Sequence, residues 1–205
     1  MSLFPMFVKL EKRVVVIVGG GLIAEGKIAG LLEAEAEVRV IAPEATRKIS
    51  EWSKEAKITW LQRKFEPADL AEAFLVIAAT SVEGVNAAVF QEAERRKILC
   101  NAVDDIENCH FYYGAVVRRG DLQIAISTNG KSPSLAQRVR KELEQSYTEE
   151  YAEWLESLGI AREALRASSR NAEESKAILH AMASREMFER YVRKGKSDEK
   201  RERMN

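Results

Sequence analysis

The chain has 205 residues, of which 46% are hydrophobic and 31% charged, a composition typical of a soluble protein with one full domain and a smaller second one. Its formal net charge at pH 7 is zero, which argues against general binding to nucleic acid. No apolar run approaches the length needed to span a bilayer, so we expect no membrane partner. Two cysteines do not make a disulfide scaffold, which favours a cytoplasmic protein with reduced thiols.

The first predicted strand runs into a glycine-rich turn. Val14–Val18 is apolar without polar alternation, as in a buried strand, and the spacing of apolar residues predicts a helix over Leu22–Leu32. Between them, Gly19-x-Gly21-x-x-Ala24 matches the dinucleotide-binding fingerprint. Its first glycine makes the tight turn, its second lets a pyrophosphate approach the backbone, and Ala24 permits close helix–strand packing. The alternative is a glycine-rich turn that only packs.

The end of this helix and the next strand depart from the usual pattern. A glycine is expected after the helix in the left-handed conformation, but the sequence offers Glu35, at a cost of about 1 kcal/mol. The second strand, Glu37–Pro43, lacks the acidic end residue that binds ribose. We expect the backbone around Pro43 and Glu44 to border the adenosine instead, and no arginine stands at the strand end, which favours NAD over NADP.

Strands and helices then alternate up to residue 103, which predicts right-handed crossovers and a doubly wound parallel sheet of the Rossmann type. The predicted elements are a helix over 45–56, a short strand over 58–65, a short helix over 67–73, a strand over 74–80, a helix over 82–96 and a strand over 97–103.

From Phe111 to Thr128 the sequence predicts a β-hairpin that turns at Gly120. Ser132 is the predicted N-cap of a helix that begins at Pro133, and the chain is helical from residue 146 onward.

Asp104 follows the strand over 97–103, at the sheet edge where ligands of open α/β sheets bind. A carboxylate there can accept a proton, and Asp105 can raise its pKa by like-charge repulsion. Asp105 is the rival candidate for the base, and a cap of a loop or helix is the structural alternative. Cys109 and His110 are adjacent and cannot complete a tetrahedral site, so no metal is expected.

The stretches FPMFVKLEKRVVVIVGGGLIAEGKIAGLLEA, CNAVDD and ISTNGKSPSLAQRVRKELE, in this order, resemble precorrin-2 dehydrogenase, the NAD-dependent enzyme of siroheme synthesis. The resemblance implies oxidation of precorrin-2 to sirohydrochlorin in a homodimer, and some members also insert ferrous iron into the product. It implies an NAD-binding domain over 1–112, a dimerisation and tetrapyrrole-binding segment over 113–147 and a C-terminal helical domain over 148–205.

The resemblance also assigns roles to individual positions. It places the NAD loop at Gly19, Gly21, Leu22 and Ile23, the second-strand contact at Pro43 and Glu44, and the catalytic aspartate at Asp104. Thr128 falls where some relatives carry serine.

Because the substrate is a polycarboxylate, we expect cations around it. The candidates are Lys131, Arg138, Arg118 and Arg119. The competing function is a non-enzymatic NAD-sensing module, which needs no counterpart of the STNGKSPSLAQ stretch and usually keeps the acidic residue that is missing here.

Overall fold

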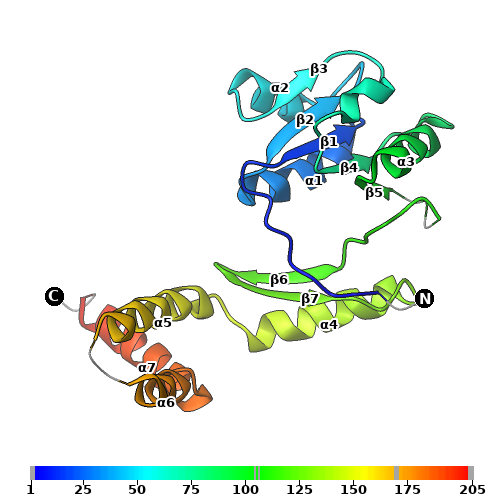
Figure 1. Ribbon diagram of the computed structural model, residues 1–205. Helices are drawn as coiled ribbons and strands as arrows, with labels where there is room; N and C mark the ends of the chain where they lie inside the picture. Colours follow the sequence, from blue (N-terminus) through cyan, green and yellow to red (C-terminus); the bar gives the residue numbers. More distant parts are fainter. Residues whose placement is uncertain (1–2, 104, 106, 169–170, 203–205) are drawn as a thin grey trace. The chain divides into compact units, whose positions relative to one another are not determined.

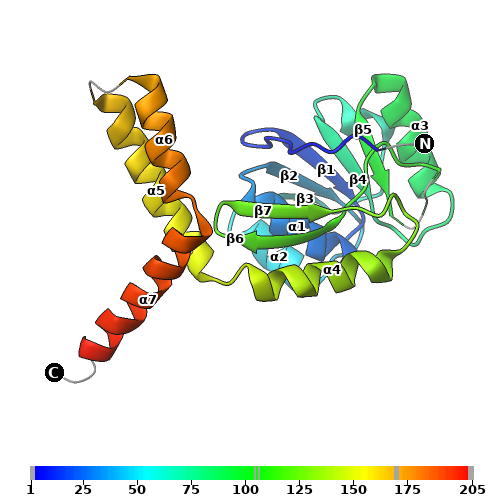
Figure 2. The ribbon, with the colours of Figure 1, turned by 90° about the horizontal axis from the view of Figure 1, so that it is seen from below.

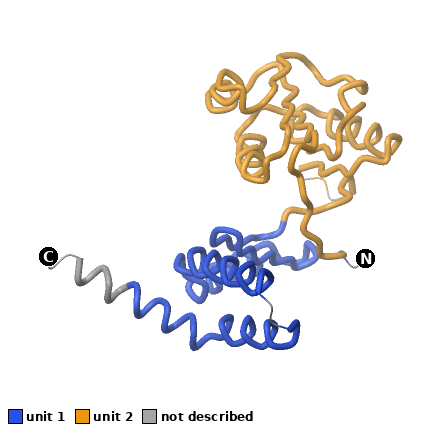
Figure 3. The backbone as a smooth tube through the Cα atoms, turned by 60° about the vertical axis from the view of Figure 1, so that its left-hand side comes forward, with its two compact units in different colours: residues 1–3, 114–205 blue, residues 4–113 orange. Residues whose placement is uncertain are grey.

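The structure is a computed structural model that describes residues 3–103, 105, 107–168 and 171–202, with side chains up to residue 195. It divides into two compact units (Figure 3), one formed by residues 4–113 and the other by the remaining described residues. The predicted three-part division, with boundaries after residues 112 and 147, stays a prediction.

The unit of residues 4–113 is built on a parallel sheet of five strands in the order β3-β2-β1-β4-β5 (Figure 1). The strands are β1 (Val14–Val18), β2 (Glu37–Ile41), β3 (Thr59–Leu61), β4 (Leu75–Ala78) and β5 (Leu99–Ala102). The connecting helices are α1 (Leu22–Glu33), α2 (Arg47–Lys54), the 3-10 helix η1 (Pro67–Leu70) and α3 (Val85–Arg96). The predicted doubly wound α/β fold is confirmed, and the order of strands reverses at β1, which pairs with β2 on one side and β4 on the other.

The sheet is buried on both faces. Val15 and Ile17 of β1 point into one core, with residues of α1 and α2, whereas Val16 and Val18 point into a second core, with residues of η1 and α3. All four side chains are at most 3% exposed. This double burial explains why the strand sequences are continuously apolar.

The helices α1, α2 and α3 of this unit each end at a left-handed residue that is not glycine. Glu35 has φ +56°, its N–H binds Leu32 O, and the following N–H of Ala36 binds Leu31 O. These two bonds close α1 by a Schellman motif. Ala56 and Lys97 stand at equivalent positions after α2 and α3, with φ +56° and +59°. The prediction that Glu35 takes the left-handed position is confirmed.

We expect Glu35→Gly to raise the free energy of unfolding by about 0.5–1 kcal/mol, because glycine removes the steric cost of the left-handed conformation while losing somewhat more chain entropy. Chemical denaturation at neutral pH measures the change. Glu33→Gly, two residues earlier inside α1, is the matched control and should lower stability by about 1 kcal/mol. A loss of stability in Glu35→Gly comparable to that control would contradict this explanation.

Several predicted boundaries in this unit are wrong by a few residues. β3 covers only Thr59–Leu61 rather than residues 58–65, and η1 ends at Leu70. α2 begins at Arg47 because the Thr46 hydroxyl accepts a hydrogen bond from Ile49 N. α3 begins at Val85 rather than residue 82, because Gly84 adopts a left-handed φ of +76° that no helix continues.

The second unit begins with the predicted hairpin, formed by β6 (Ala115–Arg119) and β7 (Leu122–Ile126). Gly120 turns it with φ +56°, as expected. α4 (Pro133–Ser146) runs along the hairpin (Figure 2). The predicted cap is confirmed, because the Ser132 hydroxyl accepts from Leu135 N at 3.2 Å.

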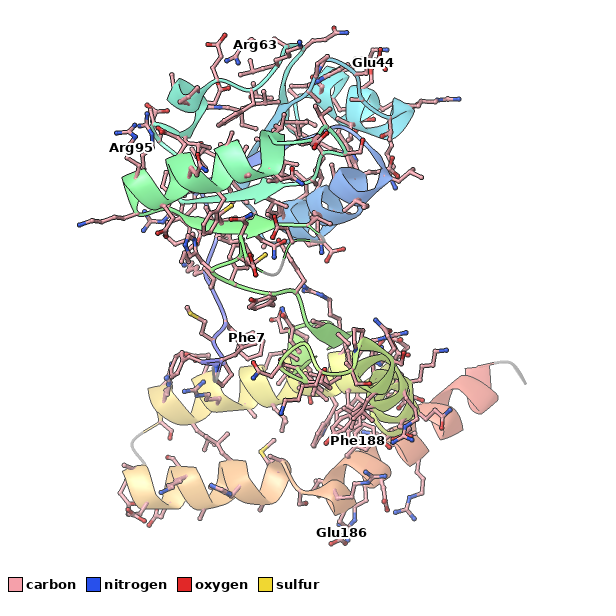
Figure 4. All side chains as sticks on the ribbon, turned by 90° about the vertical axis from the view of Figure 1, so that its right-hand side faces the viewer. Phe7, Glu44, Arg63, Arg95, Glu186 and Phe188 are labelled. Atoms are coloured by element: carbon pink, nitrogen blue, oxygen red, sulfur yellow. The ribbon has the colours of Figure 1, made fainter. Side chains whose placement is uncertain are left out.

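The remaining helices are α5 (Glu150–Ala167), α6 (Ala172–Met182) and α7 (Arg185–Glu202). An aromatic cluster joins α5 to α7 around Phe188, which Figure 4 labels. The ring of Tyr151 stacks on Phe188 at 3.9 Å between centroids, and Trp154 lies 5.1 Å from Phe188. Aromatic pairs at such distances add stability beyond area burial. None of the described helices is both long and apolar enough to cross a membrane.

Candidate dinucleotide site

Gly19 makes the tight turn expected of the first fingerprint glycine. It has φ +124°, and its N–H binds Ile41 O at 2.9 Å. A Cβ atom at this position would lie 2.2 Å from Ala79 O at the end of β4. The turn therefore crosses the sheet where β1 meets β4, which is the switch point at which open α/β sheets bind ligands.

Gly20 is required by close packing, a role that the sequence analysis did not assign. A Cβ atom on it would lie 2.1 Å from Glu44 O, and its own carbonyl accepts from Thr46 N at 2.9 Å. The glycine turn is thus held against the segment that follows β2. The available signal was a third consecutive glycine where the fingerprint asks for none.

Gly21 faces open space. A Cβ atom there would meet no atom within 4 Å, and its φ of −81° is available to any residue. Gly21 is the N-cap of α1 and no side chain caps that helix, so the N–H groups of its first turn are left for a ligand. Leu22 and Ile23 beside it are 79% and 50% exposed. An uncapped helix start with an open approach fits the pyrophosphate of a dinucleotide.

Ala24 is fully buried in the core between α1 and the sheet. The close helix–strand packing expected at this fingerprint position is therefore present.

The end of β2 is shaped by Trp60, whose indole Nε1 donates to Ala42 O at 3.0 Å. Pro43 and Glu44 follow as exposed residues, and Figure 4 labels Glu44 at the surface of this unit. Arg47 is paired with Glu51 at 2.7 Å. The backbone of Pro43 and Glu44 is thus accessible, next to the glycine turn that it contacts through Gly20.

The loop after β4 is a further part of this edge that the sequence analysis missed. The amide side chain of Asn86 accepts from Thr80 N and donates to Thr80 O, and the Thr80 hydroxyl accepts from Val82 N. These bonds hold the loop rigid directly beside Gly19. The available signal was the polar Thr80-Ser81 pair that ends an apolar strand.

The loop after β5 carries both candidate bases. Asp104 lies outside the described residues. The carboxylate of Asp105 accepts two hydrogen bonds from Asn108, one from its backbone N at 3.3 Å and one from Nδ2 at 2.5 Å. Asp105 is therefore engaged in shaping the loop.

Asn101 and Cys109 tie the same loop to the end of β5. The buried amide of Asn101 donates to Phe111 O at 2.9 Å, and the Cys109 thiol lies 3.1 Å from both Ala102 O and Asp105 O. Burial raises the pKa of this thiol, so it stays protonated and donates. Nothing in the sequence around Asn101 indicated this role.

His110 closes the open edge of β5. Its backbone N–H donates to Cys100 O at 2.8 Å, and its ring Nδ1 accepts from Cys100 N at 3.0 Å. The other ring nitrogen, Nε2, lies 2.5 Å from Glu94 Oε1. Burial raises the pKa of the Cys100 thiol to about 12, so this thiol is inert. Within the described residues, no three His, Cys, Asp or Glu side chains cluster closely enough to hold a metal ion.

The predicted substrate-binding residues belong to the second unit. The Thr128 hydroxyl donates to Ser132 O at 3.1 Å and accepts from Ser132 N at 3.2 Å, so it shapes the turn before α4. Lys131 is exposed in this turn, and the exposed Arg138 lies 3.3 Å from Glu142 on α4.

Arg119 corrects the expected set of cations. Its guanidinium donates to Tyr147 O and Glu144 O and lies 3.2 Å from Glu149, and its side chain is only 12% exposed. It joins the hairpin to α4 and the start of α5, and is not available to a substrate. Arg118 is exposed.

Residues 6–115, which nearly coincide with the first unit, match the NAD(P)-binding family model. The chain belongs to the NAD(P)-binding family. Residues 119–146 of the second unit match a further model, described as the central part of sirohaem biosynthesis proteins. The expected nicotinamide dinucleotide cofactor is confirmed at the level of the family.

Similar proteins extend the comparison over most of the chain. Siroheme synthase 1 of Serratia proteamaculans is 40% identical over 144 residues, which are 70% of this chain and 30% of that protein. Siroheme synthase of Neisseria meningitidis serogroup C is 37% identical over 174 residues, 85% of this chain and 36% of that protein. The chain thus spans about a third of the length of these curated relatives.

A solved structure of SirC, described as a precorrin-2 dehydrogenase, resembles this chain with a TM-score of 0.80 at 27% sequence identity. The match covers 91% of this chain and 92% of that one. The fold of this chain, with its parallel sheet, hairpin and C-terminal helices, is therefore that of a solved protein.

Proposed function

We propose that this protein oxidises precorrin-2 to sirohydrochlorin with NAD as the hydride acceptor, in the pathway to siroheme. The observation that carries the proposal is the pair of segments at the carboxyl edge of the sheet. The glycine turn after β1 is open and leads into an uncapped helix, and the loop after β5 carries aspartate and is hydrogen-bonded to that strand through Asn101. The likeness to a precorrin-2 dehydrogenase over nearly the whole chain supports the same reaction.

The reaction removes one hydride and one proton from the tetrapyrrole. NAD, when bound, supplies the hydride acceptor. The N–H groups at the start of α1, with open space at Gly21, would hold its pyrophosphate. The backbone of Pro43 and Glu44 would border its adenosine, and the exposed side chains of Leu22 and Ile23 would shield the bound cofactor from water.

Asp104 is the proposed proton acceptor. The support is indirect, through its neighbour: both carboxylate oxygens of Asp105 accept bonds from Asn108, so Asp105 is committed to the loop. A general base must be able to turn toward the proton that it abstracts, and these two bonds hold the Asp105 carboxylate toward Asn108. This division of roles favours Asp104 over Asp105.

For the substrate carboxylates we propose a cationic group in the second unit that contains Lys131 and Arg138, together with the N-terminus of α4. The Ser132 N-cap and the paired hydrogen bonds between Thr128 and Ser132 hold the turn that presents Lys131. Thr128 therefore contributes by shaping this turn.

A binding and turnover experiment separates the enzyme from an NAD sensor. NAD affinity is measured by calorimetry, and turnover is followed by the absorbance of NADH after precorrin-2 is added without oxygen. Tight NAD binding with NADH formation supports the proposal. Tight binding without any NADH would favour the sensor.

We further propose a homodimer assembled through the hairpin. β6 and β7 form a sheet of two strands, which no third strand joins within the described part of the chain. Two-stranded sheets are marginally stable alone, and unpaired strand edges pair readily with another chain.

We expect light scattering at micromolar concentration to give twice the mass of one chain. A proline at Gln123 or Ala125, which face outward on β7, is expected to weaken the dimer because proline cannot donate to an added strand. A single-chain mass for the unmodified protein would contradict the proposal.

A further inference from the structure

We infer that Lys27 is a positioning residue, whose contact with the ring of Tyr113 holds the aspartate-bearing loop of residues 103–113 against the nucleotide-binding helix α1. The inference rests on the proposed function for its catalytic consequence only. The contact itself lies within one unit of the structure.

The first observation is the contact between the ammonium group and the ring. Lys27 Nζ lies 3.6 Å from the centroid of the Tyr113 ring. Lys27 is only partly exposed, and burial lowers the pKa of its ammonium group. Among the described residues no carboxylate forms an ion pair with Lys27, and the electron-rich face of Tyr113 is the described group that lies against its charge. Cation–π contacts are strongest when partly desolvated in this way.

The second observation is the path of the loop. Val103 at its start and Phe111 near its end both pack against the core that contains Ala24 and Ile28 of α1. Lys27 lies between Ala24 and Ile28 in the sequence of α1. The ring of Tyr113 lies 5.7 Å from the ring of Phe111. Both ends of the loop therefore pack against the core to which α1 contributes.

The third observation concerns the opposite side of the loop. There it is tied to β5, by the bond from Asn101 Nδ2 to Phe111 O and by the two bonds between His110 and Cys100. The loop is thus tied to β5 by these hydrogen bonds, and Tyr113 at its end contacts α1 through Lys27.

The contact between Lys27 and Tyr113 therefore connects the helix that binds the cofactor with the loop that carries the proposed base. The N-terminus of α1 carries the cofactor turn, and the loop carries the proposed base. Loss of the contact leaves the turn at Gly19–Gly21 intact, so NAD affinity should persist. It loosens the base relative to the cofactor, and small misplacements of reacting groups lower the chemical step.

The test is a double-mutant cycle. Lys27→Met keeps the aliphatic stem and removes the charge, and Tyr113→Leu removes the ring. Each is expected to lower kcat by about 2–30-fold, the range of a cation–π contact, with KM for NAD changed less than about twofold. The double variant should be no worse than the poorer single variant, because both changes break the same contact.

Conservative variants separate this role from simple packing. Lys27→Arg keeps a cation, so it should retain most of the turnover that Lys27→Met loses. Tyr113→Phe keeps the ring, so it should retain most of the turnover that Tyr113→Leu loses. Lys54→Met, on the exposed surface of α2, is the matched control and should behave like the unmodified protein.

Hydrogen exchange supplies a readout that does not depend on turnover. In the NAD-bound protein without tetrapyrrole, Lys27→Met should exchange faster in residues 103–113 and unchanged in β1. Unchanged exchange in that loop, or additive losses in the cycle, would overturn the inference. Absence of precorrin-2 oxidation by the unmodified protein would instead refute the proposed function, and the exchange comparison would still decide the inference.

Discussion

Asp104→Asn is expected to lower the turnover of precorrin-2 by about 10²–10⁴-fold, the usual contribution of a general base. The amide keeps the size of the side chain but cannot accept the proton. NAD affinity should stay within about twofold, because the pyrophosphate site lies at the separate turn of residues 19–21. Steady-state rates and calorimetric NAD binding on the same preparation measure both quantities.

Asp105→Asn is the matched comparison. Asparagine keeps an oxygen that can accept the bond from Asn108 N, so the loop retains one of the two contacts made by Asp105. Its turnover should therefore fall much less than that of Asp104→Asn. The opposite ranking would transfer the role of base to Asp105, and near-normal turnover in both variants would mean that no carboxylate of this loop takes the proton.

Gly21→Asp is expected to weaken NAD binding by about 10²–10³-fold while the fold survives. Two like charges about 4 Å apart near a protein surface repel by about 4 kcal/mol, and the new carboxylate would face the pyrophosphate. The fold tolerates the change, because the position has open space around it and a φ of −81°. Calorimetry with NAD and thermal unfolding without it measure the two effects.

Neighbouring glycines give the controls for this prediction. Gly21→Ala should keep most of the NAD affinity lost in Gly21→Asp, because it adds no charge. Gly20→Ala places a Cβ atom where Glu44 O lies 2.1 Å away, so it should lower stability by about 1–3 kcal/mol. Unchanged NAD affinity in Gly21→Asp would remove the basis for this site.

The α/β unit could be predicted from the sequence because its signals are local. A continuously apolar strand such as Val14–Val18 has no face exposed to water, and the structure buries both of its faces. The turn at Gly19 and the helix end at Glu35 could also be predicted, because each requires a positive backbone φ. Such features depend on a few neighbouring residues only.

Other features depend on partners distant in sequence. Nothing beside Arg119 indicates that its guanidinium binds Tyr147 O and Glu144 O, so it was expected among the substrate cations. Likewise, Asn101 acts through Phe111, and Gly20 through Glu44. The break at Ala183 and Ser184 between α6 and α7 was also missed, because the chain was predicted to be helical from residue 146 onward.

The central claim is that this chain itself transfers a hydride from precorrin-2 to NAD. A single-turnover experiment without oxygen tests it most directly, with protein and NAD in excess over precorrin-2 and both products quantified by absorbance. We predict equal amounts of NADH and sirohydrochlorin, formed in the unmodified protein and strongly slowed in Asp104→Asn. Sirohydrochlorin without matching NADH, or neither product while NAD remains bound, would contradict the claim.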